Sequence, residues 1–101
     1  MNKHQVSALH FAASYNDADL IKKLLARGVD VNLATPDGVT PLMRAAEGNS
    51  LRALRILIEH GARTDLKSRY GDTAQSLAEH RGLHKAALLL SAKPGDHTRA
   101  F

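Results

Sequence analysis

The chain has 101 residues, of which 44% are hydrophobic, 24% are charged and 4% are aromatic, and its formal net charge is +4. This length fits one domain, and the hydrophobic share excludes a disordered segment because it is enough to build a core. Cysteine is absent, which excludes disulfides and thiolate metal sites and fits a reducing, cytoplasmic location. No apolar run approaches the roughly 18 residues that a membrane helix needs.

The sequence repeats itself at an interval of 33 residues. Shifting the segment Thr40–Ala46 by this interval reaches Ser7–Ala13 in one direction and Thr73–Glu79 in the other. The same offset relates Gly28 to Gly61. A fixed period of this size predicts stacked units, each of which buries its apolar face only against a neighbour.

Each unit is expected to begin with a short helix. Ser7 and Thr40 are hydroxyl residues at the position of an N-cap, and Pro41 follows where a missing N–H costs nothing. The pairs Ala12-Ala13 and Ala45-Ala46 place small side chains where this helix must approach its neighbours closely.

A tight turn then leads into a second helix. Asn16, Asn49 and Gly82 occupy one equivalent position, and these residue types tolerate a left-handed backbone. Gly28 and Gly61 are expected to end the second helices as C-caps. The apolar residues of these helices recur at helical spacing: Leu20, Ile21, Leu24 and Leu25, then Leu51, Leu54, Leu57 and Ile58.

Extended links join each unit to the next. They are predicted over Val29–Asp37 and Ala62–Tyr70. Each link ends in a turn signal, Pro36-Asp37-Gly38 in the first and Arg69-Tyr70-Gly71 in the second.

These motifs resemble the ankyrin repeat family. The middle unit carries its opening pattern as Gly38–Ala46, and the first unit carries its closing pattern as Leu24–Asn32. The resemblance covers roughly residues 2–93 and implies an all-α ankyrin-repeat solenoid of three helix–turn–helix units with hairpin-like loops. The repeats are expected at about 2–34, 35–67 and 68–93 of a domain spanning 1–93.

The outer units depart from this pattern. Gln5 replaces the turn glycine of the first unit, as a terminal cap would allow, and Gln75 stands where the third unit should have leucine. Pro94 and Gly95 are expected to stop the last helix, leaving residues 94–101 as a flexible tail.

The resemblance implies that the chain binds another protein through its concave face, as a small monomeric inhibitor or adaptor without a cofactor. Tyr15, Arg69 and Tyr70 are the expected anchors, because Tyr and Arg dominate interface energetics. The predicted partner-binding positions lie on hairpin tips and inner-helix surfaces: Ser14, Tyr15, Thr35, Asp37, Val39, Glu47, Arg69, Tyr70, Asp72, His80 and Arg81. The tips also include Pro36 and Ser68, and Gly48 lies beside Glu47.

Catalysis and metal binding find little support. The chain has no nucleophile elbow and no phosphate loop, so it is expected not to be an enzyme. His80 and His84 have the spacing of a helical metal pair, but Gly82 between them should break the helix, and no third ligand accompanies them. The resemblance gives His10 a structural role in tying down local turns.

Two other functions stay open. One is a structural scaffold or spacer without a partner of its own. The other, the weaker alternative, is nucleic-acid binding through a basic convex face made by Lys22, Arg52, Arg55 and Lys85. Acidic residues such as Asp19 interleave with this face, and no aromatic platform for bases accompanies it.

Overall fold

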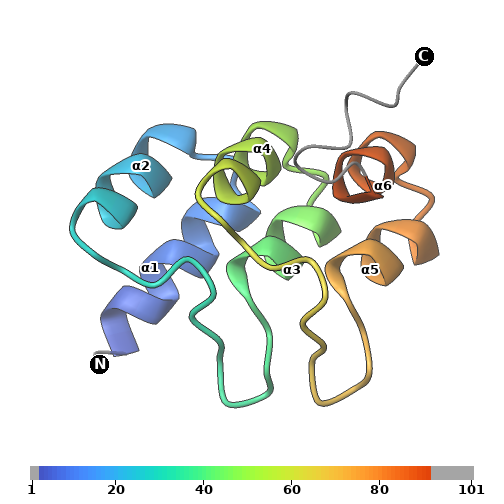
Figure 1. The fold of residues 1–101 in the computed structure, drawn as a ribbon, viewed down its shortest axis with the longest axis horizontal. Helices are drawn as coiled ribbons and strands as arrows, with labels where there is room; N and C mark the ends of the chain where they lie inside the picture. The colour runs from blue at the N-terminus through green and yellow to red at the C-terminus, as the bar shows by residue number, and fades with distance from the viewer. Residues whose placement is uncertain (1–2, 92–101) are drawn as a thin grey trace.

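The computed structural model describes residues 3–91, and every regular element in that range is an α-helix. The helices form two layers, with α1, α3 and α5 side by side in one and α2, α4 and α6 in the other (Figure 1). Two long loops project from the layer of α1, α3 and α5 (Figure 1). The six helices span Lys3–Ser14 (α1), Ala18–Ala26 (α2), Pro41–Glu47 (α3), Leu51–Glu59 (α4), Ala74–His80 (α5) and His84–Ser91 (α6). The predicted all-α stack of helix pairs is therefore confirmed.

Hydroxyl caps start the first helices of the second and third repeats. The Thr40 hydroxyl accepts a hydrogen bond from Met43 N at 3.3 Å, and Pro41 occupies the first turn. Thr73 forms a reciprocal capping box with Ser76, whose hydroxyl accepts from Thr73 N at 2.9 Å. These caps satisfy amide groups that a helix N-terminus otherwise leaves without partners.

The first helix begins earlier than the repeat pattern predicts. Helix α1 starts at Lys3, so Ser7 lies inside the helix and is not its N-cap. In the second repeat, Pro36 and Gly38 prevent helix in the equivalent segment, whereas residues 3–7 contain neither type. The predicted tail at 94–101 lies outside the residues that the structure describes.

The two helices of each repeat are joined by a left-handed turn. Asn16, Asn49 and Gly82 have φ of 60°, 54° and 69°, which confirms the equivalence expected from their spacing. The second helices of the first two repeats end in left-handed glycines, Gly28 and Gly61, that accompany Schellman-type hydrogen bonds.

The core runs continuously through the stack. Small residues at the helix crossings, such as Ala13, Ala46 and Ala78, are fully buried and let the helices approach closely. Leu9 and Leu42 are buried between repeats, whereas the equivalent Gln75 is only half-buried at the end of the described stack. A polar side chain at this position avoids exposing apolar surface where no further described repeat packs.

Polar contacts also tie the first repeat to the second. His10 Nε2 lies 2.7 Å from the carbonyl oxygen of Val39, which gives this buried histidine the turn-binding role that the resemblance implied. The Asn16 carboxamide accepts from Ala53 N at 2.9 Å, in the first turn of α4. Since the α4 N-cap Ser50 makes no side-chain capping bond, Asn16 replaces it as the cap from the neighbouring repeat.

Candidate functional site

The two projecting loops are closed hairpins of the same shape. In the first, Thr35 N donates to Val39 O at 3.0 Å, and the Thr35 hydroxyl accepts from Val39 N at 3.1 Å. In the second, Ser68 N donates to Asp72 O at 2.9 Å. Both hairpins therefore hold their tips in a defined conformation before any partner binds, which lowers the ordering cost of binding.

The hairpins are joined to each other through Arg69. Its backbone N donates to Asp37 O at 2.8 Å, and its guanidinium lies 3.2 Å from an Asp37 carboxylate oxygen. A Cβ added at Gly38 would lie only 3.2 Å from Ser68 Cα, so the backbones approach as closely as glycine permits. Arg69 thus contributes to the architecture as well as to the surface, and its guanidinium lies 6.0 Å from the centre of the Tyr70 ring.

A pocket of about 230 Å³ opens where the hairpins meet the inner helices. We call it the inter-repeat pocket. It brings together five of the predicted partner-binding residues, although they are distant in sequence. Its lining comprises Asp37 and Val39 from the first hairpin, Met43, Arg44 and Glu47 from α3, Ser68, Tyr70 and Asp72 from the second hairpin, and Leu77 from α5.

Tyr70 is the most exposed part of this lining, with 68% of its surface accessible. Ser68, by contrast, is only 8% exposed, and its hydroxyl accepts from Tyr70 N at 3.2 Å. Ser68 therefore shapes the hairpin from within, whereas Tyr70 and the neighbouring Arg69 expose their side chains to solvent.

A second aromatic surface lies at the C-terminal end of α1, where Tyr15 directly follows the last helical residue. Tyr15 is 68% exposed and packs edge-on against Phe11, which is 60% exposed, with ring centroids 4.4 Å apart. Sequence reasoning chose Tyr15 but missed Phe11, although the spacing of four residues places both rings on one helix face. An exposed aromatic pair of this kind is unusual on a surface that contacts only water.

The remaining predicted positions lie around these two features. Arg44 pairs with Glu47 at 3.8 Å. Ser14 is half-buried, and its carbonyl accepts from the Ser50 hydroxyl at 2.9 Å. His80 and Arg81 are exposed at the end of α5 and do not line the inter-repeat pocket.

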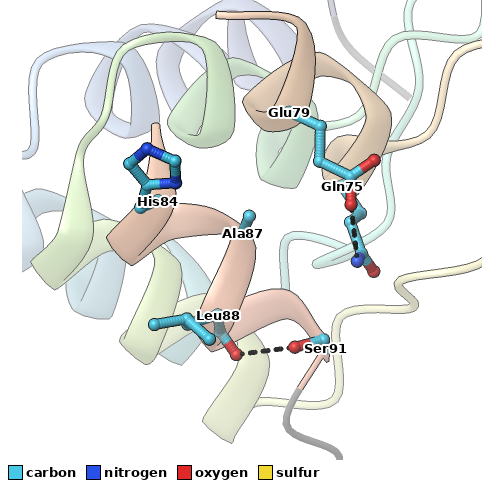
Figure 2. Close-up of a pocket in the computed structure, with 6 residues that line it drawn as sticks. All are labelled: Gln75, Glu79, His84, Ala87, Leu88 and Ser91. Carbon is cyan, nitrogen blue, oxygen red and sulfur yellow. Dashed lines mark hydrogen bonds between the residues drawn. The ribbon is translucent and has the colours of Figure 1, made fainter. Parts of the chain in front are cut away.

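Another pocket, of about 380 Å³, lies at the end of the stack (Figure 2). We call it the end pocket. Gln75 and Glu79 come from α5 and are joined by a hydrogen bond of 3.1 Å, while the Ser91 hydroxyl donates to Leu88 O at 3.1 Å on α6 (Figure 2). Leu88 is 67% exposed there. His84 and Ala87 complete its lining.

The basic residues predicted on the convex side are exposed. Lys22 lies on α2, Arg52 and Arg55 on α4, and Lys85 on α6. None of the four takes part in an ion pair with the described side chains of residues 8–91. They therefore remain available to an anionic ligand.

The described residues hold neither a metal-binding cluster nor a membrane-spanning helix. In that range no group of three His, Cys, Asp or Glu side chains is placed to hold a metal ion. His80 ends α5 and His84 begins α6, with the left-handed Gly82 between them, so the pair does not share one helix. Across the same residues, every helix is too short or too polar to span a bilayer.

In the link between the second and third repeats, the ion pair of Arg63 and Asp65 shifts the pKa of both side chains. Arg63 donates two hydrogen bonds to Asp65, of 3.1 and 2.9 Å. These bonds hold the pKa of Asp65 below its ordinary value and raise the pKa of Arg63. The pair lies outside both pockets.

Known proteins resemble this chain over most of its length. It is 34% identical over 82 residues to the potassium channel AKT1 of Oryza sativa subsp. indica, covering 81% of this chain and 9% of the channel. It is 34% identical over 83 residues to the B-cell lymphoma 3 protein homolog of Mus musculus, covering 81% and 18%. It is 36% identical over 73 residues to the protein phosphatase 1 regulatory subunit 12A of Mus musculus, covering 72% of this chain and 7% of that protein. The chain thus spans less than a fifth of each relative.

The fold has a counterpart among solved structures. The crystal structure of the human ASB11 ankyrin repeat domain matches with a TM-score of 0.76 at 32% identity, covering 81% of this chain and 37% of that one. A family profile described as ankyrin repeats in three copies matches residues 9–100. Ankyrin repeats are in general non-enzymatic modules that bind other proteins. On the profile, the relatives and the stacked helix pairs together, the chain belongs to the ankyrin repeat family.

Proposed function

We propose that this chain binds a folded protein partner on the face formed by its hairpins and inner helices, and acts as a small cytoplasmic inhibitor or adaptor. The observation that carries the proposal is the inter-repeat pocket, a preformed depression bordered by the exposed Tyr70. A rigid surface with an exposed aromatic side chain loses little conformational entropy when a partner docks.

The aromatic pair on α1 supports the same face. Phe11 lies on the inner helix α1 and Tyr15 directly follows its last residue, and the pocket residues Met43 and Leu77 lie on the inner helices α3 and α5. A partner that covers α1, α3 and α5 would meet aromatic surface in the first repeat and the pocket between the second and third. Among the relatives, one is by name a regulatory subunit of a phosphatase, which acts through another protein.

Two alanine variants test this proposal. A partner is first captured from the source cells with the wild-type chain and identified by mass spectrometry. Its affinity is then measured for Tyr70→Ala and Tyr15→Ala, each expected to weaken binding by more than about 1 kcal/mol, or roughly fivefold, with little change in thermal stability. Leu88→Ala is the matched control, because Leu88 is equally exposed but lies in the end pocket. Unchanged affinity in both tyrosine variants would show that another face binds.

Nucleic-acid binding remains the second candidate, supported by four exposed cations that have no ion pair with a described side chain: Lys22, Arg52, Arg55 and Lys85. Binding through several phosphates must weaken steeply as salt rises. A titration of duplex and single-stranded DNA at low and high salt checks this, and undetectable binding at low salt removes the idea. If neither a protein nor a nucleic acid binds, the chain is a structural spacer.

A further inference from the structure

The inter-repeat pocket combines an apolar lining with a carboxylate, that of Asp72, which has no partner among the side chains that the structure describes. Val39, Met43 and Leu77 contribute apolar atoms, and Tyr70 contributes an aromatic wall. The volume of about 230 Å³ far exceeds the roughly 10–15 Å³ that one water needs, so the pocket has room for a side chain. These features alone describe a place for any long, partly apolar group.

The charges around the pocket are not equally compensated. Asp37 pairs with Arg69 at 3.2 Å, and Glu47 pairs with Arg44 at 3.8 Å. Asp72 is half-buried, and among the described side chains of residues 8–91 its carboxylate makes neither an ion pair nor a hydrogen bond. A partly desolvated carboxylate without a partner is unfavourable, and a cation supplied from outside would relieve that cost.

The local charge also runs against that of the whole chain. Of the three carboxylates that line the pocket, two pair with guanidiniums and one, that of Asp72, is left to make the pocket negative, whereas the chain carries a formal charge of +4. An acidic depression on a basic protein selects a cationic group and disfavours an anionic one. The Arg69 guanidinium lies 6.0 Å from the Tyr70 ring centre, at the outer limit of a cation–π contact.

We infer that the inter-repeat pocket binds an arginine side chain of the partner protein, with its methylene stem on Met43 and Leu77 and its guanidinium on Asp72 beside Tyr70. Arginine fits better than lysine because its planar guanidinium pairs with a carboxylate through two hydrogen bonds and stacks on aromatic rings. This assignment rests on the proposed function, since it names the group that the partner presents to the same face.

The test uses the isotopically labelled full chain and a defined probe, N-acetyl-arginine amide. Saturable shifts are expected in the amide signals of Val39, Tyr70 and Asp72, with a midpoint on the order of 10 mM, which is typical of a weak fragment. N-acetyl-citrulline amide has nearly the same shape without the charge and is expected to give no saturable shift. Equal binding of both probes, or no saturable shift well above that midpoint, overturns the inference.

Two charge-neutralising variants make the result specific. Asp72→Asn is expected to weaken arginine-amide binding about tenfold or more, because it removes the charged acceptor. The fold should persist, since the hairpin uses the backbone oxygen of Asp72 and not its side chain. Glu59→Gln changes the overall charge equally but lies on α4, outside the pocket, and should leave binding unchanged. Equal weakening by both variants would point to a general charge effect and overturn the assignment.

Failure of the inference can be told apart from failure of the proposed function. If Tyr70→Ala weakens binding of the captured partner but the arginine probe does not bind, the face is right and the arginine assignment is wrong. If the probe binds and Asp72→Asn abolishes it, while both tyrosine variants keep full affinity for the partner, the pocket is real but the partner uses another face.

Discussion

The Asn16 carboxamide offers the sharpest test of how the repeats stabilise one another. Its oxygen accepts from Ala53 N at 2.9 Å and so caps α4 from the preceding repeat. Asn49 occupies the same turn in the next repeat with φ of 54°, close to the 60° of Asn16. Yet no hydrogen bond of the Asn49 side chain occurs within the described range. The two asparagines share a backbone conformation and differ in one interaction.

Replacing each asparagine by glycine separates these two contributions. Asn49→Gly changes only the backbone preference of an exposed turn, so the free energy of unfolding should stay within about 0.5 kcal/mol of the wild-type value. Asn16→Gly makes the same backbone change and also leaves the Ala53 amide without its cap. The difference between the variants should be about 1 kcal/mol, the usual value of a helix cap. Asn16→Ala should cost about 1–2 kcal/mol more than Asn16→Gly, because alanine is strained in the left-handed conformation.

Urea denaturation followed by circular dichroism measures these differences. An unchanged m-value would show that the compactness of the unfolded state is the same, and a loss of 1 kcal/mol should lower Tm by about 4–8 °C in a domain of this size. Equal losses in Asn16→Gly and Asn49→Gly would refute the reasoning, because the turn alone would then account for the effect. A neutral Asn16→Gly would mean that water replaces the carboxamide at no cost.

Two further predictions concern the loops between repeats. Gly38→Ala should destabilise the fold by about 1–2 kcal/mol more than Gly71→Ala in thermal unfolding, because both have positive φ but only at Gly38 would a Cβ lie 3.2 Å from Ser68 Cα. Arg63→Gln should raise the pKa of Asp65 towards its ordinary value in an NMR titration, because the hydrogen bonds from Arg63 lower it. The pair with Arg63 makes the pKa of Asp65 lower in the folded state than in the unfolded state. The stabilisation of the fold that results from this difference is therefore fully present above the unfolded-state pKa of Asp65. It is lost as the pH falls through the folded-state pKa.

Most of the fold could be predicted because its signals are local and recur. The positive φ of Asn16, Asn49 and Gly82 follows from residue types that tolerate that conformation, at one position of a 33-residue period. The start of α1 could not be inferred by copying the period onto the first unit. Ser7 has the residue type of a cap, but residues 3–6 before it have no proline or glycine to prevent helix.

The site was only partly accessible to sequence reasoning. The equivalence of the hairpins places Asp37 and Tyr70 on neighbouring tips, but the ion pair between Asp37 and Arg69 depends on how the repeats are offset in space. The spacing of residues in the sequence does not determine that offset. The sequence therefore predicts Arg69 as an anchor for a partner and does not reveal its ion pair with Asp37. Phe11 could have been found, because it lies four positions before Tyr15, a spacing that brings two side chains together at the end of a helix.

The inter-repeat pocket belongs to no single repeat, and this has a consequence for reading mutations. Met43 and Glu47 come from the second repeat, whereas Tyr70 and Asp72 come from the third, and the backbone bond from Arg69 to Asp37 holds the two sets in register. A core substitution between α3 and α5 that shifts the repeats would separate the two halves of the pocket without touching a partner. Loss of binding after such a change therefore reports on register, whereas loss after changing the exposed Tyr70 side chain reports on contact. Only the second kind of result identifies the binding face.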